Sequence, residues 1–336
     1  GTDTANITIK VIGINDVPVA QDDVGVIVEG STLTVANSAN ANETNDTGST
    51  YNATGEHTGD VIDTSLAGSK DSDADASASL RVSKIKLSGG TNSDVNNNTT
   101  YNGSGGSAGT SITGTYGTLT IGADGSYTYA ATTDATNALD SGESASDTFV
   151  YTLSDGTAIT TANLTITVLG SNDAPVAQND VGVIAEDSTL TVSDGADANE
   201  TGGSYNATGE HSGDVIDSSN TSTRDTDVDV ETLTVTAIRL GSSEGSGTAG
   251  TVGSALTGTY GQLTLNSNGS YSYVANQTAA DALDAGDSVT DSFNYTVSDG
   301  TATDTAVITI TVLGINDIPT AQNDVGVIVE DGTLTV

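Results

Sequence analysis

The sequence predicts an all-β fold built as a linear array of tandem β-sandwich modules. A turn signal, Asn-Asp-Xaa-Pro, occurs three times and begins at Asn15, Asn172 and Asn316. Each copy follows one alternating apolar run and precedes another, so a strand ends, the chain turns and a new module begins. Thr, Val, Ile and Tyr in short runs favour strands over helices. Many such runs, separated by Gly, Asn and Asp turns, indicate a sandwich within each repeat.

The turn signals divide the chain into two complete modules and two fragments. Residues 1–16 repeat the residues that end at Asp317, so they are expected to be the last strand of a preceding repeat. Module 1 then spans residues 17–173, and module 2 spans residues 174–317. Residues 318–336 match the first strands of a module and predict a following repeat. The chain is therefore expected to be a window from a longer polypeptide whose targeting signals lie elsewhere.

The predicted strands follow the same order in both modules. In module 2 they are expected at 181–184, 189–192, 233–240, 263–265, 271–273, 293–297 and 306–312. In module 1 the matching runs lie at 80–87, 119–121, 127–129, 149–151 and 164–169. Asn268-Gly269 predicts a tight hairpin turn, and Asp299-Gly300 predicts another. Residues 133–139 and 278–283 could each form one helical turn, and the remaining pattern is a β-meander.

The charge balance excludes several classes of partner. Lys and Arg total 7 against 45 Asp and Glu, which gives a formal net charge of −38. Such a chain is repelled by nucleic-acid phosphates and by anionic membrane surfaces, and it has no apolar stretch long enough to insert in a membrane. Self-repulsion of this strength destabilises the compact state unless cations neutralise it, and divalent metal ions do so efficiently.

The chain contains no Cys, Met or Trp. Disulfides and thiolate metal sites are therefore excluded. An extracellular location is not excluded, because calcium can stabilise secreted repeats in place of disulfides. Few lysines and many Thr, Ser, Asn and Gly residues are typical of an extracellular surface protein.

Three acidic features recur at matching positions and predict calcium ligands. They are the Asn-Asp pair of each turn signal, a Glu after the first strand of each module, and a run of alternating aspartates. Calcium takes roughly six to eight oxygen ligands, which carboxylates, Asn side chains and backbone carbonyls can supply together. The predicted ligands are Asn15, Asp16, Glu29, Asp71, Asp73, Asp75, Asn172, Asp173, Glu186, Asp225, Asp227, Asp229, Asn316 and Asp317.

The alternative for the aspartate runs is a solvated acidic loop. Close carboxylates repel one another unless they are neutralised, so a bound cation explains their presence in both modules better. The run is not an EF-hand loop. Its sixth position, where an EF-hand needs Gly, is Ala76 or Val230, and its twelfth, where a bidentate Glu is needed, is Val82 or Thr236. The predicted calcium geometry is therefore of another kind.

The combination of an early Glu, an Asp-Xaa-Asp segment and a terminal Asn-Asp-Xaa-Pro resembles cadherin-like repeats, which are Ig-like β-sandwiches. Asp-Thr-Phe-Val-Tyr-Thr-Leu-Ser-Asp-Gly at 147–156, Gly-Ser-Tyr-Thr-Tyr at 125–129 and Val-Leu-Gly-Ser-Asn-Asp-Ala-Pro at 168–175 are similar to the VCBS-type repeats of large bacterial surface adhesins. Such adhesins are of the RTX type, exported by type I secretion. The resemblance covers essentially the whole chain. It implies an extracellular, calcium-stiffened spacer or adhesive array at the bacterial cell surface, used for attachment and biofilm formation, with neighbouring repeats of the same chain as partners.

The resemblance also implies how the ligands are grouped. A calcium site at the junction of the two modules would draw on Glu29, Asn172, Asp173, Asp225 and Asp227, with Asp229 as a further candidate. The junction with the preceding module would draw on Asn15, Asp16, Asp71 and Asp73. The sequence departs from the cadherin pattern at Gly13, Gly170 and Gly314, where an aspartate is expected, and it lacks a Leu-Asp-Arg-Glu segment. These departures argue against a full three-ion cluster.

Other candidate sites have simpler explanations. His57 and His211 occupy the same repeat position and could bind a transition metal with neighbouring carboxylates. One His per module is too few for a zinc site unless carboxylates complete it, so a loop held by hydrogen bonds is the preferred interpretation. Ser154 and Ser298 lie in Ser-Asp-Gly turns, and no nucleophile elbow is present, so no enzyme activity is expected.

Two other functions stay open. Like chains could polymerise into a filament by strand donation, in which case residues 1–12 and 321–336 would be functional. A carbohydrate-binding module is the second possibility, with cell-surface or matrix glycans as partners. Tyr116 and Tyr260 would then stack on sugars, although a position at the edge of the core is the simpler interpretation of both rings.

Overall fold

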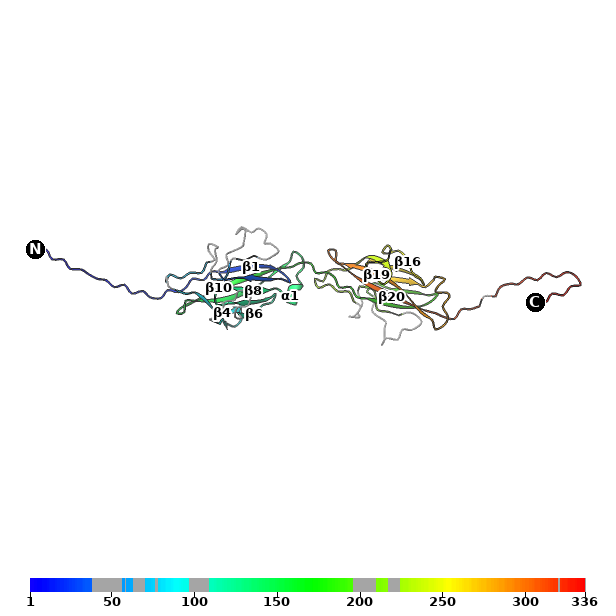
Figure 1. Ribbon diagram of the computed structural model, residues 1–336, viewed down its shortest axis with the longest axis horizontal. Coiled ribbons are helices and arrows are strands. Elements are labelled where there is room, and N and C mark those ends of the chain that lie inside the picture. The colour runs from blue at the N-terminus through cyan, green and yellow to red at the C-terminus, as the bar shows by residue number, and fades with distance from the viewer. Residues whose placement is uncertain are drawn as a thin grey trace. The chain divides into compact units, whose positions relative to one another are not determined.

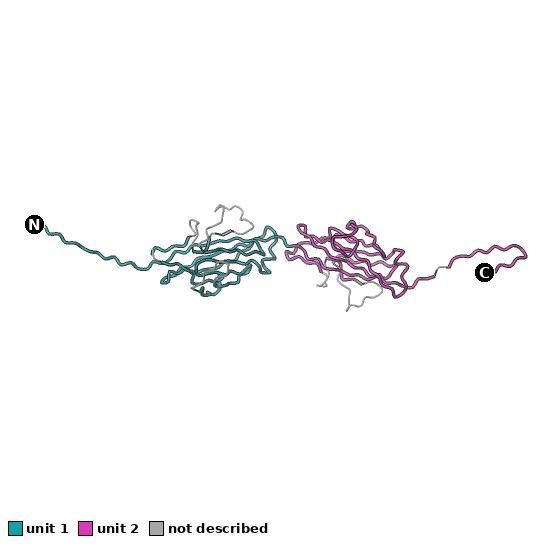
Figure 2. Tube along the Cα trace, viewed as in Figure 1, with its two compact units in different colours: residues 1–173 teal, residues 174–336 magenta. Residues whose placement is uncertain are grey.

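Strands and tight turns make up both halves of this chain, which forms two units, residues 1–173 and residues 174–336 (Figure 2). The computed structural model describes residues 1–37, 56–57, 59–62, 70–75, 78–96, 109–195, 210–216, 224–319 and 321–335. Each unit is a β-sandwich, and the helix among these residues is the single turn α1 (Asp134–Asn137) (Figure 1). The predicted all-β fold class is confirmed. No described helix has the length and apolar character needed to cross a membrane.

Unit 1 consists of a six-stranded sheet and a four-stranded sheet. The larger sheet has the order β3-β1-β10-β9-β4-β5, and the smaller has the order β2-β8-β7-β6. The strands are β1 (Asp23–Val28), β2 (Thr32–Val35), β3 (Glu56–His57), β4 (Arg81–Leu87), β5 (Ser93–Asp94), β6 (Thr110–Thr113), β7 (Thr118–Ile121), β8 (Tyr127–Ala130), β9 (Ser144–Ser154) and β10 (Ile159–Leu169).

Unit 2 repeats this plan strand for strand. Its sheets have the orders β13-β11-β20-β19-β14-β15 and β12-β18-β17-β16. The strands are β11 (Asp180–Ala185), β12 (Thr189–Val192), β13 (Glu210–His211), β14 (Thr234–Leu240), β15 (Thr248–Ala249), β16 (Leu256–Thr257), β17 (Gln262–Leu265), β18 (Tyr271–Val274), β19 (Ser288–Ser298) and β20 (Thr303–Leu313).

The first strand of each unit lies parallel to the last, which a simple meander would not produce. β1 pairs with β10 from Asp23 opposite Leu164 to Val28 opposite Leu169, and β11 pairs with β20 in the same way. The chain then crosses to the smaller sheet at a turn whose second residue has positive φ. That residue is Gly30 in unit 1 (φ 68°) and Asp187 in unit 2 (φ 58°). Gly and Asp are among the residues that tolerate this backbone region.

Inward-facing tyrosines and phenylalanines fill both cores. Tyr129 packs edge-on against Phe149 with ring centroids 6.1 Å apart, and Tyr273 packs against Phe293 at 6.4 Å. All four rings are fully buried. Edge-to-face contact is a favoured arrangement of aromatic pairs. These rings are the large side chains of the two cores, because the chain has no Trp or Met.

Three local predictions need correction. The strand predicted at 149–151 extends over the whole of β9, because every residue from Ser144 to Ser154 pairs with β10. The alternation expected in the runs that became β4 and β14 is interrupted by a β-bulge in each. Residues 278–283 form turns and not a helix. The Thr133 hydroxyl caps α1 by accepting the Thr136 N–H, whereas Gln277 occupies the matching position and is a poorer N-cap.

The segments assigned to neighbouring repeats contain no strand in residues 1–18 or 321–335. Their apolar side chains are exposed, for example Ile7 at 88% and Val327 at 86%. A strand requires hydrogen bonds to a partner strand, and these segments find none among the described residues. Their assignment to neighbouring repeats stays a prediction.

Candidate metal centre

A buried glutamate follows the first strand of each unit and binds the start of the linker. In unit 1, Glu29 Oε1 accepts hydrogen bonds from the backbone N–H of Ser171 at 2.5 Å and from its hydroxyl at 2.7 Å. In unit 2, Glu186 Oε1 accepts the N–H of Ile315 at 2.5 Å. Ser171 and Ile315 directly precede the Asn of their turn signals, so each glutamate fastens the linker to its own sandwich.

The second carboxylate oxygen of both glutamates is buried without a hydrogen-bond partner. Glu29 is 8% exposed and Glu186 is 0% exposed, so water does not readily compensate for the missing bond. A buried acceptor left unsatisfied costs about 1–3 kcal/mol, and more when it carries charge. The same unmet requirement in both units indicates a position where a cation fits.

The alternating aspartates divide into an inner and an outer residue. The inner one is buried: Asp71 Oδ1 accepts the Gln21 N–H, and Asp225 Oδ1 accepts the Gln178 N–H, each at 2.7 Å. Asp225 Oδ2 is buried without a partner. The inner aspartates therefore have a structural role inside the sandwich in addition to their predicted role as ligands.

The next aspartate of each run forms a local turn. Asp73 Oδ1 accepts the Asp75 N–H at 2.7 Å, and Asp227 Oδ1 accepts the Asp229 N–H at 3.0 Å. Oδ2 of Asp73 and Oδ2 of Asp227 are buried without a hydrogen-bond partner. Both units therefore have, at the same position, a second buried carboxylate oxygen that accepts no hydrogen bond.

In unit 1 the turn signal meets the aspartate run. The Asp16 N–H donates to Asp75 Oδ2 at 2.9 Å, and the Asn15 side-chain amide donates to Asp155 Oδ2 at 2.9 Å. The backbone N–H groups of Ala158 and Thr157, and then Asn15, lower the pKa of Asp155. The structure therefore brings Asn15, Asp16 and Asp75 together as predicted ligands, and it adds Asp155, whose Ser-Asp-Gly sequence indicated only a turn.

The three turn signals share one local conformation. The Asn side-chain amide donates to the carbonyl of the next residue, from Asn15 to Asp16 at 2.6 Å and from Asn316 to Asp317 at 2.8 Å. Asn172 makes the same bond to Asp173. The repeated sequence therefore encodes a repeated turn, independently of any metal.

Unit 2 also buries a pair of carboxyl groups around one tyrosine. The Tyr295 hydroxyl donates to Asp180 Oδ2 at 2.8 Å, and the Ser212 hydroxyl donates to Asp180 Oδ1 at 3.0 Å. Burial is the main cause that raises the pKa of Asp180 to about 8 and the pKa of Asp225 to about 8. Sequence reasoning missed Asp180, although the repeated Gln-(Asp/Asn)-Asp that starts each module was a signal for it.

A cavity of about 340 Å³ lies beside the aspartate run of unit 2. Asp225 and Asp227 line it together with Arg224 and Glu231. Val230 also lines it and has a φ of 67°, which is strained for a β-branched residue. This is the position at which an EF-hand would carry Gly, and its counterpart Ala76 lies outside the described residues.

Neither unit by itself offers a complete acidic cage. Within each unit, no three His, Cys, Asp or Glu side chains of the described residues place their ligand atoms within 4.8 Å of one another. A calcium ion held by one unit would therefore also need Asn, backbone carbonyl or water oxygens, which calcium accepts readily. Unpartnered carboxylate oxygens are the hard ligands that calcium prefers, so the residues present fit this ion.

The remaining predicted sites have structural roles where they are described. Asp214, three residues after His211 in the repeat, accepts the N–H of Ile216 at 2.8 Å and that of Gly195 at 2.5 Å, as a hydrogen-bonded loop would require. The His57 side chain lies outside the described part of the chain. Tyr116 and Tyr260 are half-buried and pack against their cores.

One family model matches part of this chain. A family model described as a bacterial cadherin-like domain matches residues 172–314. No curated protein matches the chain in sequence. Among solved structures, protocadherin gammaB7 is 12% identical over 61% of this chain and 40% of its own, with a TM-score of 0.30. An endo-fucoidan hydrolase of glycoside hydrolase family 107 is 14% identical over 89% of this chain, with a TM-score of 0.24.

A pair of titin domains in complex with telethonin is 12% identical over 90% of this chain and 99% of its own, with a TM-score of 0.26. This chain spans 29% of the length of the fucoidan hydrolase. Structural scores of this size support no conclusion about activity, so the assignment depends on the family model and on the sandwich itself. Residues 172–314 are similar to a bacterial cadherin-like domain.

Proposed function

We propose that this chain is a calcium-stiffened extracellular repeat region of a bacterial surface adhesin or filament, and that it acts as a spacer or attachment element in cell adhesion and biofilm formation. Bacterial cadherin-like domains suggest an extracellular, adhesion-type module, and the match of residues 172–314 to such a domain supports the proposal. The observation that carries the proposal is the buried, unpartnered Oε2 of Glu29 and of Glu186, repeated at the end of the first strand in both units.

The proposed ion is calcium because of the donor set and the surroundings. The predicted ligands are carboxylates and Asn side chains, with no Cys and no described His among them. Such hard oxygen donors favour calcium over softer transition metals. The net charge of −38 gives the chain a general attraction for divalent cations.

The proposed stiffening follows from the hydrogen bonds that each glutamate accepts from the linker. Glu29 binds Ser171 through Oε1, so an ion on Oε2 would fix the linker to the end of β1 through one side chain. A bound calcium ion would balance the negative charge of the buried Glu29 carboxylate. The linker torsions next to Asn172 would then be restrained, and bending between consecutive modules would be reduced.

The test replaces Glu29 with an isosteric amide in the full chain. Glu29→Gln keeps an acceptor for Ser171 but turns an amide toward the ion, so it should abolish calcium stabilisation of unit 1. At a dissociation constant near ~10⁻⁴ M, millimolar calcium should stabilise the unmodified unit by about 1.5 kcal/mol. Thermal unfolding with unit-resolved hydrogen exchange measures this gain, and small-angle scattering measures the length of the chain with calcium and with chelator.

The matched control is Glu143→Gln, which removes an exposed carboxylate from the same unit. This control should keep both the calcium gain and the length. The proposal is wrong if the unmodified chain gains neither stability nor length from calcium, or if Glu29→Gln gains as much as Glu143→Gln.

A further inference from the structure

The hairpin turn between β17 and β18 contains a chemically reactive dipeptide, Asn268-Gly269. In an Asn-Gly sequence the backbone nitrogen of Gly can attack the side-chain amide carbon of Asn, because Gly has no side chain that blocks the approach. Asn is for this reason among the thermolabile residues of proteins. The Asn268 side chain is exposed, so solvent reaches the amide group.

The reaction is a spontaneous deamidation that needs only water. A bond forms from Gly269 N to Asn268 Cγ, and the bond from Cγ to Nδ2 breaks. The leaving nitrogen departs as ammonia and takes the proton of the Gly269 N–H. Water then opens the succinimide ring at one of its two carbonyls, which gives either aspartate or isoaspartate. No oxidant, reductant or enzyme is required.

A single backbone hydrogen bond holds the reacting peptide group. The Gly269 N–H donates to the Asn266 carbonyl at 3.1 Å. The backbone carbonyl of Asn268, on the other side of this peptide group, accepts no hydrogen bond from the described residues. One exposed hydrogen bond shifts an opening equilibrium by about two- to tenfold. The folded turn can therefore open far enough for the ring to close.

Two side chains beside the amide favour the attack. Ser270 Oγ donates to Asn268 Oδ1 at 2.8 Å, and Asn266 Nδ2 donates to Ser270 Oγ at 3.0 Å. This chain of hydrogen bonds polarises the amide carbonyl. It also stabilises the negative charge that Oδ1 gains when the ring closes. The turn therefore positions a hydroxyl group that promotes the reaction.

Unit 1 has the acid form of the same turn. Asp124 occupies the position of Asn268, and Asp124 Oδ1 accepts the Ser126 hydroxyl at 2.7 Å. The turn closes in the same way, because the Gly125 N–H donates to the Gly122 carbonyl at 3.2 Å. The fold therefore accepts a carboxylate at this position.

The neighbour of this position differs between the units. In unit 1, Asn37 Nδ2 donates to Asp124 Oδ2 at 2.9 Å. The matching residue of unit 2, two residues after β12, is Asp194, so the amide and the acid have exchanged places. A carboxylate formed at Asn268 would have an acid where Asp124 has an amide donor, and like charges repel. Deamidation should therefore weaken unit 2.

We propose that Asn268 deamidates spontaneously in the folded protein, so that unit 2 loses stability as the molecule ages. The isoaspartate product is the more damaging one, because it adds one carbon to the backbone directly before Gly269. Gly269 is buried, and a Cβ on it would lie 3.1 Å from Ile216 N. Its carbonyl accepts the Val215 N–H at 3.2 Å. The lengthened turn cannot keep all of these contacts.

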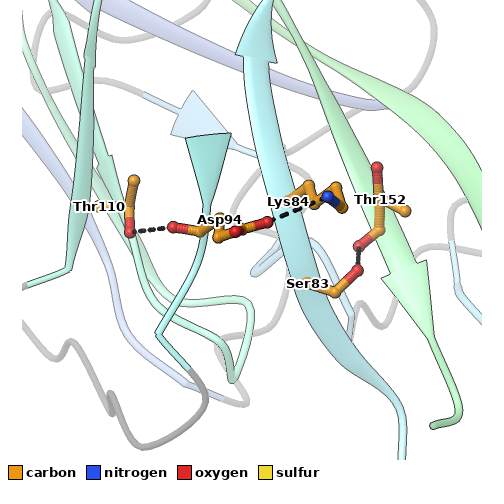
Figure 3. Close-up of polar contacts among 5 residues, drawn as sticks. All are labelled: Ser83, Lys84, Asp94, Thr110 and Thr152. Carbon is orange, nitrogen blue, oxygen red and sulfur yellow. Dashed lines mark hydrogen bonds and ion pairs between the residues drawn. The ribbon is translucent and has the colours of Figure 1, made fainter. Parts of the chain in front are cut away.

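A second Asn-Gly-Ser sequence, at 102–104, provides an internal reference. It lies outside the described residues, between β5 and β6. Near the two ends of this segment, the Thr110 hydroxyl donates to the Asp94 carbonyl at 3.2 Å, and Asp94 forms an ion pair with Lys84 at 3.0 Å (Figure 3). Reaction at Asn102 reports that the conditions of a sample allow deamidation.

The experiment incubates the full chain in calcium buffer at physiological temperature, with and without guanidinium chloride. Mass spectrometry of chymotryptic peptides follows the acid formed at Asn268 and Asn102. Asn268 should react in the folded chain within about tenfold of its rate in denaturant. The rate should rise with pH, because the attacking nitrogen must lose its proton. Ser270→Ala should slow the folded reaction about two- to fivefold, and the matched control Ser104→Ala should not change it.

Further variants separate the two products. Asn268→Asp reproduces the acid and should lower the denaturant midpoint of unit 2, and adding Asp194→Asn should restore it by rebuilding the pair of unit 1. Aged Asn268→Gln should keep its midpoint while the aged unmodified chain loses stability. The proposal is overturned if Asn268 stays intact in the folded chain through several half-lives of the reaction in denaturant. It is also overturned if Asn268→Gln loses as much stability on ageing as the unmodified chain.

Discussion

The two units share their buried polar contacts almost residue for residue but differ on their outer faces. Asp147 accepts the N–H groups of Thr115 at 2.8 Å and Tyr116 at 3.0 Å, and the Tyr129 hydroxyl at 2.7 Å. In unit 2, Asp291 accepts the matching Thr259, Tyr260 and Tyr273 groups at 2.9, 2.9 and 2.7 Å. The outward residues of β4 and β14, in contrast, do not match. Buried positions follow the requirements of the fold and therefore match, whereas exposed positions are free to differ.

The glycines of the repeated Gly-Thr-Tyr-Gly loop belong to the shared interior. A Cβ at Gly114 would lie 2.0 Å from Asp147 Oδ2, and one at Gly258 would lie 2.4 Å from Asp291 Oδ2. The loop must approach the carboxylate this closely for its N–H groups to reach it. Glycine is therefore required here for space and not for an unusual φ.

The largest expected effect is the loss of this carboxylate. Asp291→Ala leaves the N–H groups of Thr259, Tyr260 and Gly261 and the Tyr273 hydroxyl without their buried acceptor. We expect unit 2 to lose about 3–5 kcal/mol of unfolding free energy, while unit 1 is unchanged. Urea unfolding followed by unit-resolved hydrogen exchange measures both. Asp281→Ala, an exposed aspartate of unit 2, is the control, and similar losses from the two variants would contradict a shared buried network.

A smaller effect on the stability of unit 2 is expected from a change in pH, because Asp180 and Asp225 form a buried carboxyl pair there. Burial raises the pKa of Asp180 to about 8, while in the unfolded chain an aspartate ionises near pH ~4. The folded unit therefore holds protons that the unfolded chain releases, so this stabilisation is complete below pH ~4 and declines as pH rises toward about 8.

Between pH 5 and pH 8 in chelator, we expect unit 2 to lose on the order of 1–3 kcal/mol. Asp180→Asn, which stays neutral, should reduce this slope to the part that Asp225 contributes, and Asp281→Asn should not change it. The urea concentration at the midpoint of unfolding, measured across this pH range, tests this expectation. An Asp180→Asn variant that keeps the full slope would assign the pH dependence to the general negative charge of the chain.

The smallest effect concerns a position where the two units carry different residues in the same conformation. Gly30 and Asp187 both have positive φ, and a Cβ at Gly30 would meet nothing within 4 Å. Gly30→Asp should therefore cost less than about 1 kcal/mol, because lower chain entropy in the unfolded state partly offsets the left-handed backbone. Thermal unfolding should show Gly258→Ala to be far more damaging. Equal costs would mean that space is not what distinguishes the two glycines.

Much of the fold could be predicted because the sequence repeats its turns and alternates its apolar residues. The strands around Tyr127, Phe149 and Leu164 were located from period-two patterns, and the turns from Asn-Gly and Asp-Gly. The parallel pairing of β1 with β10 could not be predicted, because it depends on contacts between residues far apart in the sequence. The bulge at Ser83 is visible only as a three-residue spacing between Val82 and Ile85, which strict alternation does not anticipate.

The candidate ligands were selected for a similar reason, and their role as ligands stays a prediction. Residue type and repetition indicated Glu29, Asp73 and Asp227 as ligands, but not that each would hold one oxygen in a backbone hydrogen bond and leave the other free. Asp155 was missed because its Ser-Asp-Gly sequence was explained by a turn. Asp180 was missed because its Gln-Asn-Asp sequence was explained by the start of a module. Their roles depend on what lies beside them in three dimensions.

The parallel pairing of first and last strands determines how a module responds to mechanical tension. A pull on the chain enters at the Asp23 end of β1 and leaves at the Leu169 end of β10, which are opposite ends of one paired ladder. The load is therefore applied in shear across all the rungs at once, and they cannot open one after another as in an antiparallel hairpin pulled from its open end. The same ladder is present from Asp180 to Leu313 in unit 2. A pull on the two ends of either sandwich would therefore load this ladder in shear.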